Sequence, residues 1–461
     1  MNLRDLALAM LPEHLLLAGI VVVILRDLLP GKPRDGFAPA FAFLLLAALA
    51  AAFMALVWYD GSPFAGQFSV APADLTAKAV VFGLALPVLM LSRDEFADAR
   101  FPVLMLASLY GIGLMLSSDS FLTLFVGLEL MSLPVYVLVV LAYRGPRSAE
   151  AALKYLVLGG AASATLLMGA ALVYGAAGSL STAALAAALG SQDTMAIAGA
   201  MLVIAAFFLK AAIVPFHAWA PDAYEGASVS VTAYMATIVK AAVLLAAVRM
   251  LATATLVPPL ADLVAFLPLV SIVWGNLAAM RQKSFRRMIA YSSIAHAGYM
   301  FYALLGAGDG RFQAVLFYAI AYGLMNLLAF AALPRADDDA AADRIDSLRG
   351  LFQRAPFQAL MIAVAMLSLA GIPPLPGFVA KFLIFRNVMA GGYTTYAVLG
   401  LVGSYLGIYF YLRVIQLMFM SEPESSTTRA SPRQLMRFTS LVCLVAAVVV
   451  AVFPGWILAQ L

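Results

Sequence analysis

The sequence predicts an all-α fold, a polytopic membrane helix bundle of about 14 transmembrane helices, and three observations lead to it. First, 64% of the 461 residues are hydrophobic and only 11% are charged, more apolar surface than a soluble domain of this length could bury. Second, apolar runs recur along the whole chain, each long enough to cross roughly 30 Å of hydrocarbon. Third, basic residues alternate between successive connections. Helices are expected because hydrocarbon offers no partner to an unpaired backbone group.

The predicted spans share a length near 20 residues and a largely uncharged interior, and together they form a single membrane domain over residues 1–461. They cover residues 12–29, 37–59, 73–92, 101–117, 120–142, 149–175, 195–217, 227–251, 259–280, 286–307, 312–333, 356–373, 394–420 and 435–458. The twelfth span continues through a break to about residue 390.

The distribution of basic residues predicts the orientation. The odd-numbered connections hold 18 Arg and Lys residues, whereas the even-numbered ones and the two termini hold four. Because cytoplasmic connections carry the excess of basic residues, the odd-numbered connections are predicted to be cytoplasmic and both termini to lie outside. The net charge of +4 therefore reports topology and does not indicate a nucleic-acid partner, since the basic residues do not gather with aromatic residues on one face.

The first five spans contain few polar groups. The first follows Glu13 and His14 and lacks an evident small-residue cleavage site, so it is predicted to be a retained helix and not a signal peptide. The glycine pair at Gly111–Gly113 lies inside the apolar fourth span and is interpreted as helix packing. Glu129, in the fifth span, is interpreted as the one acid well inside a span. We expect it to pair with a buried lysine, either as a tuning group or as a static structural ion pair.

Five of the seven lysines lie within predicted spans, namely Lys78, Lys154, Lys210, Lys240 and Lys381. A charge in the bilayer is costly, and lysine, unlike arginine, can lose its proton when it is desolvated, so these residues are candidate proton stations. Lys240 is mid-span with no charge within a helical turn, which favours a functional role. Lys154 follows Glu150 by four residues, so a stabilising i, i+4 pair or snorkelling is the alternative to a functional role, and snorkelling is likewise the alternative for Lys78.

Two spans are broken in a corresponding way. The seventh contains LKAAIVPFHAWAPDAYEGA and the twelfth LAGIPPLPGFVAKF, and each break has a lysine about five residues away, Lys210 and Lys381. Proline removes a helical hydrogen bond and clashes with the preceding turn. Paired broken helices indicate an inverted-repeat transporter with a midplane site, although an ordinary proline kink is the alternative. The two repeat halves are expected at about 101–251 and 259–420.

Two of the three histidines lie in positions suited to proton relay. His217 is in the seventh-span break, and His296 is inside the tenth span among Tyr291, Ser292 and Ser293. An unperturbed imidazole titrates near pH 6.5, so either residue could relay a proton, and a neutral histidine satisfied by a neighbouring hydroxyl is the competing interpretation. The basic residue of the thirteenth span, Arg413, is expected to pair with a carbonyl or an acid.

The chain shows no chemistry of its own for redox or phosphate reactions. It has no glycine-rich phosphate loop, no CxxC pair and no nucleophile elbow, and no two histidines have metal-ligand spacing. Its one cysteine, Cys443, cannot form an internal disulfide or an iron–sulfur site and is interpreted as a core residue. We expect no catalytic residue, cofactor or metal in this chain.

Four segments together resemble the antiporter-like membrane subunits of respiratory complex I. They are GLELMSLPVYVL, SAEAALKYLVLGGAASATLLMGAALVYGAAGS, LKAAIVPFHAWAPDAYEGA and YSSIAHAGY. The resemblance covers roughly residues 70–420 and is closest to the subunit N family of the bacterial NADH:quinone oxidoreductase. The last two segments are also shared with Mrp-type cation/proton antiporters and membrane-bound hydrogenases, which remain the alternative.

The resemblance implies a proton-translocating subunit of the bacterial inner membrane, driven by quinone reduction elsewhere in the complex. It implies that Glu129 and Lys210 form a switchable ion pair, and it maps Lys240 and Lys154 onto the lysines that the family has in the eighth and sixth helices. Protons are implied to pass through a central hydrated axis, with Lys381 towards the other half-channel. Other membrane subunits of complex I are the implied partners, and NADH, FMN, iron–sulfur clusters and quinone are expected in partner subunits. A membrane scaffold whose charges only hold helices together is the remaining possibility.

Overall fold

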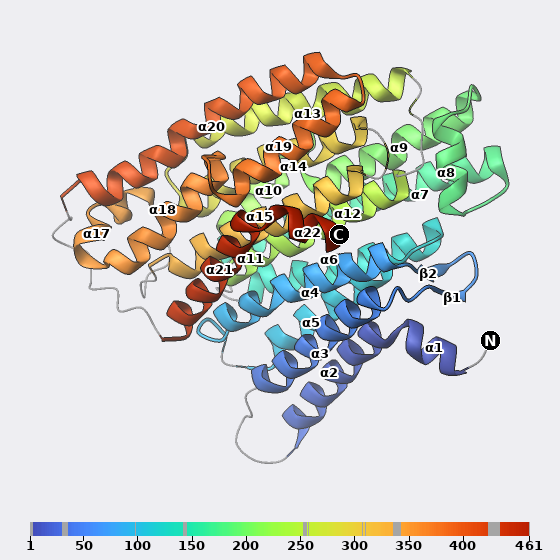
Figure 1. Cartoon of the computed structure of the whole chain (residues 1–461). Helices are drawn as coiled ribbons and strands as arrows, with labels where there is room; N and C mark the ends of the chain where they lie inside the picture. The colour runs from blue at the N-terminus through green and yellow to red at the C-terminus, as the bar shows by residue number, and fades with distance from the viewer. Residues whose placement is uncertain are drawn as a thin grey trace. The chain divides into compact units, whose positions relative to one another are not determined.

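The computed structural model describes residues 3–29, 36–96, 98–141, 145–251, 256, 258–306, 308, 310–334, 343–422 and 434–460. These residues are mainly helical (Figure 1). Within them, ten helices are long and apolar enough to cross a membrane, and two shorter helices, Arg100–Leu116 and Pro356–Ala370, are also apolar. The all-α, multi-pass membrane architecture is therefore confirmed, whereas the count of 14 spans stays a prediction.

The helices fall into two compact units, which are described separately. Unit 1 comprises Met1–Ala211, Gly226–Val231 and Ile238–Leu263. Its elements are α1 (Leu3–Ala9), α2 (Leu11–Leu28), α3 (Phe37–Leu56), β1 (Gly61–Phe64), β2 (Phe68–Val70), α4 (Pro72–Ser92), α5 (Arg100–Leu116), α6 (Phe121–Leu141), α7 (Pro146–Ala177), α8 (Thr182–Leu189), α9 (Thr194–Ala211) and α12 (Lys240–Leu251). The strands form an antiparallel hairpin that pairs Gly61 with Val70, and this hairpin was not predicted from the sequence.

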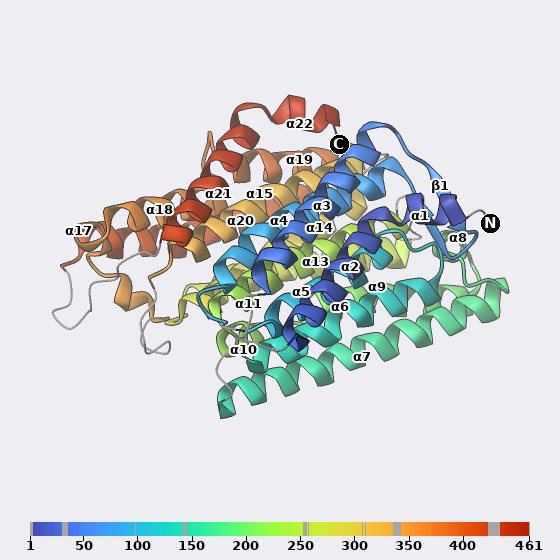
Figure 2. The ribbon, with the colours of Figure 1, turned by 90° about the horizontal axis from the view of Figure 1, so that it is seen from below.

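Unit 2 comprises Ala212–Glu225, Thr232–Thr237 and Val264–Leu461. Its elements are α10 (Trp219–Gly226), most of α13 (Pro258–Ala279), α14 (Phe285–Tyr302), η2 (Ala303–Leu305), α15 (Gly310–Ala332), η3 (Ile345–Leu348), α17 (Leu351–Arg354), α18 (Pro356–Ala370), α19 (Pro376–Ala390), α20 (Thr394–Met420), α21 (Gln434–Val452) and α22 (Pro454–Gln460). Helix α15 packs against α18, α19 and α21 (Figure 2). Helix α11 (Val229–Tyr234) and the π-helix η1 (Met235–Val239) each contain residues of both units.

Both predicted helix breaks are confirmed. Helix α9 ends at Ala211, before the predicted span end at residue 217, and the chain resumes helix at Trp219. Helix α18 ends at Ala370, and α19 begins at Pro376. In each break one residue lies in the left-handed region, Ala212 in the first and Gly371 in the second, where φ is 87°. The proline clusters therefore end the helices inside the membrane-spanning regions, as their chemistry requires.

Helices α5 and α6 approach each other closely because two glycines leave room between them. A Cβ atom on Gly111 would lie 2.4 Å from the Met131 nitrogen, and one on Gly127 would lie 2.7 Å from the Met115 nitrogen. Small residues permit this close approach of backbones, which supplies the packing that holds membrane helices together. The interpretation of Gly111 as a packing residue is therefore confirmed.

We predict that Gly111→Ala destabilises the protein by about 1–3 kcal/mol, because the added methyl group must push α5 and α6 apart. Gly83→Ala, in α4, is the matched control, since nothing would lie within 4 Å of a Cβ atom at that position. The control should be neutral or stabilising by up to about 1 kcal/mol, from helix propensity alone. Both effects are measured as the temperature at which the detergent-solubilised protein ceases to be monodisperse. Equal temperatures for the two variants would contradict the prediction.

Candidate functional site

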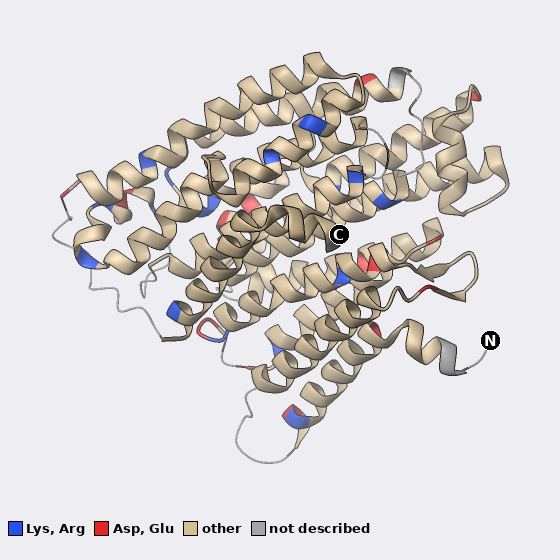
Figure 3. Cartoon of the chain, viewed as in Figure 1, with Lys and Arg blue, Asp and Glu red and all other residues tan. Residues whose placement is uncertain are grey.

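Charged residues are sparse along the helices and appear as isolated patches on an otherwise uncharged ribbon (Figure 3). In unit 1 the predicted pairing of Glu129 with a lysine is present. The Lys210 ammonium, in the last turn of α9, lies 3.5 Å from Glu129 Oε1, which belongs to α6. It donates to Ser132 Oγ at 3.1 Å and to Tyr136 OH at 3.5 Å. The Ser163 hydroxyl, from α7, donates to the Glu129 carboxylate. The lysine is 4% exposed and the acid 24%, so the acid is the more accessible partner.

The local sequence of α6 explains why these groups meet. Glu129, Ser132 and Tyr136 are spaced by three and four residues, which places them on one face of a helix. Helices α6 and α7 pack together, and α7 packs on α9, so Glu129 and Lys210 are brought together through neighbouring helices. A polar stripe on an otherwise apolar helix thus receives the lysine at the point where α9 ends.

Lys240 lies in the interior of unit 1. It is 3% exposed and begins α12, which packs against α4, α5, α8 and α9. The most apolar stretch of the helical segment Val229–Leu251 is buried throughout. The π-helix η1 ends immediately before Lys240. π-turns inside α-helices are rare, and those that occur are often at functional sites. No local sequence pattern predicted this one.

In unit 2 the Lys381 ammonium is held mainly by backbone oxygens. It donates to the Leu369 carbonyl at 3.1 Å, to the Ala370 carbonyl at 3.0 Å and to Ser404 Oγ at 3.0 Å. The two carbonyls are the last of α18, and Lys381 itself is on α19. The ammonium also lies 5.1 Å from the centre of the Tyr299 ring. A cation at a helix C-terminus is favoured by the partial negative charge there, so the break creates the binding position for this lysine.

The break around Lys381 requires two glycines. Gly371 has φ of 87°, and a Cβ atom on it would lie 3.0 Å from Lys381 Cδ. A Cβ atom on Gly377 would lie 1.9 Å from the Ser368 carbonyl oxygen. Gly377 also donates its backbone N–H to Ser368 Oγ at 3.1 Å. Any side chain at either position would displace the end of α18 from the lysine.

His296 is the centre of a hydrogen-bonded chain inside unit 2. The Tyr318 hydroxyl lies 2.7 Å from His296 Nδ1, and the Tyr411 hydroxyl lies 3.2 Å from His296 Nε2. Tyr411 in turn lies 2.5 Å from Ser292 Oγ. Each of these groups can both donate and accept a hydrogen bond, so the chain is chemically able to pass a proton. It also satisfies both nitrogens of a buried histidine, and the geometry is compatible with either role.

His217 lies in the first break, as predicted. Its Nε2 atom accepts a hydrogen bond from Trp274 Nε1 at 3.0 Å, which requires that this nitrogen carries no proton. The neighbouring Val214 N–H donates to Ser271 Oγ at 2.8 Å. Both partners belong to α13, so this helix fixes the position of the break.

Among the described residues, no group of three His, Cys, Asp or Glu residues lies close enough to hold a metal ion. Cys443 is buried and free. Arg413 donates to the Met280 carbonyl at 3.2 Å, which identifies the partner that the sequence left open between a carbonyl and an acid.

Comparison with known proteins supports one family. A family model described as NADH:quinone oxidoreductase/Mrp antiporter, TM, matches residues 118–407. The chain is 39% identical over 424 residues to NADH-quinone oxidoreductase subunit N of Pelobacter propionicus, covering 91% of this chain and 90% of that one. It is 38% identical over 386 residues to the protein of the same name from Geobacter metallireducens, covering 82% and 81%.

The chain belongs to the NADH:quinone oxidoreductase/Mrp antiporter family.

Solved structures agree with this family assignment. The chain is similar to one in respiratory complex I from Thermus thermophilus with bound aureothin, with a TM-score of 0.83, 35% identity and coverage of 97% and 98%. A chain of the Mrp complex from Dietzia sp. has a TM-score of 0.84 at 22% identity, with coverage of 100% and 96%. The second comparison shows a shared fold alone.

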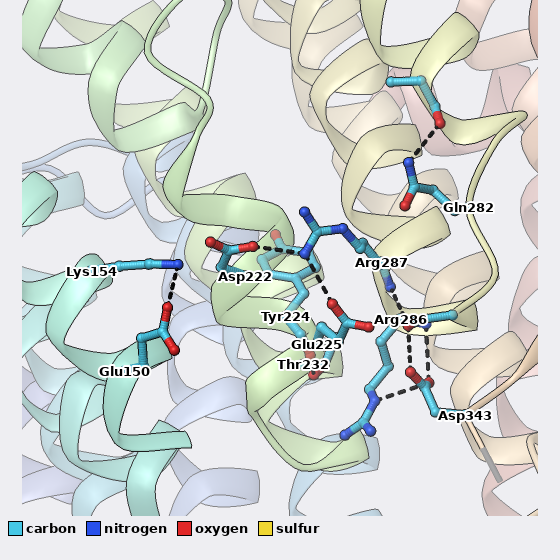
Figure 4. A network of polar contacts seen from close by, with 12 residues as sticks. Glu150, Lys154, Asp222, Tyr224, Glu225, Thr232, Gln282, Arg286, Arg287 and Asp343 are labelled. Atoms are coloured by element: carbon cyan, nitrogen blue, oxygen red, sulfur yellow. Dashed lines mark hydrogen bonds and ion pairs between the residues drawn. The ribbon is translucent and has the colours of Figure 1, made fainter. Parts of the chain in front are cut away.

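The segment matched by the antiporter family model contains all seven residues predicted from the sequence to move protons. They are Glu129, Lys154, Lys210, Lys240, His217, His296 and Lys381. Their roles stay predictions. Lys154 differs from the other lysines, since its side chain is 44% exposed and pairs with Glu150 at 2.7 Å (Figure 4). The expected i, i+4 pair is thus present, but Lys154 is not enclosed within unit 1.

A cluster of ion pairs secures the helix that follows the first break (Figure 4). Arg287 Nη1, on α14, contacts Asp222 at 2.7 Å and Glu225 at 2.9 Å, and both acids belong to α10. Nearby on the chain, Arg286 Nε contacts Asp343 Oδ1 at 3.0 Å. Burial raises the pKa of the Asp343 carboxyl above its ordinary value, although the Arg286 guanidinium acts in the opposite direction. The two acids of α10 therefore share one arginine in the first turn of α14.

A second buried acid was missed by the sequence analysis. Glu13, at the start of the first predicted span, lies in the first turn of α2 and is 0% exposed. It forms an ion pair with Lys78 of α4, with Nζ and Oε1 2.6 Å apart. Lys78 is also 0% exposed, so it does not snorkel. The signal in the sequence was the i, i+3 placement of Glu13 against Leu16, which continues the buried face of the helix.

We predict that Tyr411→Phe destabilises the protein by about 1–3 kcal/mol, because it leaves His296 Nε2 and Ser292 Oγ without this buried partner. Tyr409→Phe is the matched control on the same helix, since Tyr409 is 61% exposed. The apparent unfolding temperature of the full chain in detergent should fall for Tyr411→Phe and stay constant for Tyr409→Phe. Equal unfolding temperatures for the two variants would contradict a stabilising role for this hydrogen-bonded chain.

Proposed function

We propose that this chain is a proton-translocating membrane subunit of an NADH:quinone oxidoreductase (complex I). The observation that carries the proposal is the set of three buried lysines, Lys210, Lys240 and Lys381, all within the segment matched by the family model. Lysine is the basic residue that can lose a proton when desolvated, and each of these lysines lies at or beside a helical irregularity. The relatives named NADH-quinone oxidoreductase subunit N support the choice of complex.

The Glu129–Lys210 pair provides a switch for proton transfer. With the carboxylate nearby, the ammonium is stabilised as the charged form. If Glu129 moves away, the burial of Lys210 favours loss of its proton, which passes towards Lys240 in unit 1. Lys381 is proposed as the corresponding proton station of unit 2. The hydroxyls of Ser132 and Tyr136 stabilise the lysine while the carboxylate moves, because they already accept hydrogen bonds from it. His217, His296 and Lys154 are proposed as accessory proton-handling residues.

The chain acts in the enzyme complex without a redox centre of its own. The energy comes from quinone reduction in partner subunits, which hold the NADH site, FMN, iron–sulfur clusters and the quinone site. Other membrane subunits of complex I and lipid are the proposed neighbours. We place the chain in a bacterial inner membrane with both termini on the periplasmic side, because basic residues concentrate in the odd-numbered connections.

A subunit of an Mrp-type cation/proton antiporter or of a membrane-bound hydrogenase complex is the second candidate. The matching family model favours it, because its description includes the Mrp antiporter beside the NADH:quinone oxidoreductase. The identity to the chain of the Dietzia Mrp complex is 22%, compared with 39% to a subunit N over most of the chain, so complex I is the better supported assembly.

We predict that the full chain, tagged and solubilised in mild detergent from its native membrane, co-purifies with subunits that oxidise NADH. The measurement is NADH dehydrogenase activity with an artificial electron acceptor, together with mass spectrometry of the captured subunits. An untagged strain is the control for unspecific capture. Capture of antiporter subunits without any NADH-oxidising subunit would support the second candidate and contradict the first.

We predict that Lys240→Met lowers this subunit's contribution to the number of protons moved per NADH oxidised by at least about tenfold. Methionine keeps the volume of the side chain but cannot bind a proton. Lys283→Met is the matched control, since Lys283 lies exposed in the connection between α13 and α14. The complex is reconstituted into liposomes, and the quenching of a pH-sensitive dye is measured against NADH consumption. Normal pumping by the Lys240 variant would end the relay hypothesis.

A further inference from the structure

The buried Glu13–Lys78 pair has no part in the relay described above. It joins α2 to α4 in unit 1, outside the residues 118–407 that the family model matches. Both side chains are 0% exposed. Among the described residues, neither carboxylate oxygen nor the ammonium has a hydrogen-bond partner beyond the ion pair itself.

Stability alone does not account for this pair. Removing two charges from water costs several kcal/mol per ion, and the attraction between them offsets this only when further hydrogen bonds satisfy the remaining lone pairs and protons. Glu13 and Lys78 lack those additional bonds within the part of the chain that the structure describes. A buried pair of this kind is costly, which in a membrane protein points to a functional role.

The surroundings accommodate the pair closely. Gly113 of α5 faces the carboxylate, and a Cβ atom on it would lie 2.8 Å from Glu13 Oε1. On the other side, the Lys78 ammonium lies 5.0 Å from the centre of the Phe68 ring on β2. Gly113 therefore leaves room for the carboxylate, and Phe68 of the hairpin lies against the lysine.

A series of charged groups connects the pair with the surface of unit 1. Asp74 precedes Lys78 by one turn of α4, a spacing that puts the two side chains on one face with Cβ atoms about 5–6 Å apart. Arg249 Nε contacts Asp74 Oδ1 at 2.6 Å, and Arg249 Nη2 contacts Asp119 Oδ1 at 3.2 Å. Exposure rises along this series, from 0% for Lys78 through 4% for Asp74 to 27% for Asp119.

This series of charged groups also reaches the helix that carries Lys240. Arg249 is in the last turn of α12, the helix that begins with Lys240. Arg249 follows Lys240 by nine positions, about 14 Å along the axis. Asp119 and Arg249 lie at or beside even-numbered connections, which the distribution of basic residues predicts to be periplasmic.

We propose that Glu13 and Lys78 form a second proton-exchanging pair, which releases protons towards the periplasmic side through Asp74 and Asp119. In the transfer, an N–H bond of the Lys78 ammonium breaks and an O–H bond forms on the Asp74 carboxylate, and the proton then passes to the more exposed Asp119. The neutral Lys78 amine takes up the next proton from the interior, and Glu13 stabilises the reloaded ammonium. Arg249 keeps its proton and positions the two aspartates. This second pair rests on the proposed function of the chain as a proton-translocating subunit.

The test uses the whole complex in liposomes and the ratio of protons moved to NADH oxidised. The double variant Glu13→Gln/Lys78→Met removes both charges at similar volume, so a purely structural pair could be replaced at little cost in stability. We expect this variant to assemble and this subunit's contribution to the pumping ratio to fall at least twofold. A ratio equal to that of the unaltered complex would overturn the proposal.

A second variant separates proton exchange from charge. Lys78→Arg keeps the ion pair but cannot give up its proton, so we expect the pumping ratio to fall here as well. Normal pumping by Lys78→Arg would overturn the proposal even if the double variant did not assemble. Asp98→Asn/Arg100→Gln, which removes an exposed ion pair in the same unit, is the control and should pump normally.

Lys240→Met, measured in parallel, distinguishes failure of the second pair from failure of the proposed function. Normal pumping by Lys240→Met would overturn the proposed function itself. Loss of pumping in Lys240→Met together with normal pumping in the Glu13/Lys78 variants would overturn only the second pair.

Discussion

A positive charge buried among apolar helices must find oxygen atoms, because hydrocarbon supplies none, and this requirement organises the site. At Lys381 the oxygens are the backbone carbonyls of Leu369 and Ala370. They are available only because α18 stops there, and it stops because Gly371 takes a left-handed conformation before the proline cluster. The helix break, the glycine and the lysine therefore depend on one another, and a change in any one leaves the others without a role.

The two broken helices supply different partners to their lysines. Lys210 meets the Glu129 carboxylate, so that pair is neutral overall, whereas Lys381 meets dipoles and retains a net positive charge. Proton release from Lys381 leaves a neutral amine among carbonyls. Release from Lys210 leaves an unpaired carboxylate in a low-dielectric interior, which is costly unless Glu129 moves towards water. The geometry thus assigns a moving partner to the first lysine and a fixed cradle to the second.

The sequence was sufficient to predict what depends on residue type and spacing. Proline clusters predicted both breaks, and the single acid of the fifth span predicted that Glu129 pairs with a buried lysine, because a buried carboxylate requires a cation. Only the family resemblance identified that lysine as Lys210. The i, i+4 spacing predicted the Lys154–Glu150 pair, but it could not say that Lys154 faces outward from unit 1. That information depends on which helices cover α7, and no local pattern contains it.

The features that were missed depend on tertiary contacts between distant segments. Glu13 was treated only as a residue that precedes the first apolar run. Its burial follows from the packing of α2 against α3 and α5, where Gly113 leaves the necessary space. The hairpin of β1 and β2 is short, and its sequence contains glycine and proline, so it resembled a connection. Its importance comes from Phe68, whose contact with Lys78 arises only when the unit folds.

Helix α12 explains how one element can serve both the interior and the edge of unit 1. A helix buried on all sides needs no amphipathic pattern, so polar residues can lie at any point along it. Lys240 lies in the middle of the continuous helical segment Val229–Leu251, directly after the π-turn, and Arg249 lies near its end, where it joins Asp74 to Asp119. Because the residues between them are apolar and closely packed, a shift of α12 along its axis would move both charges together. The helix is therefore the element best placed to couple the protonation of Lys240 to the ion pairs of Arg249 at the predicted periplasmic edge.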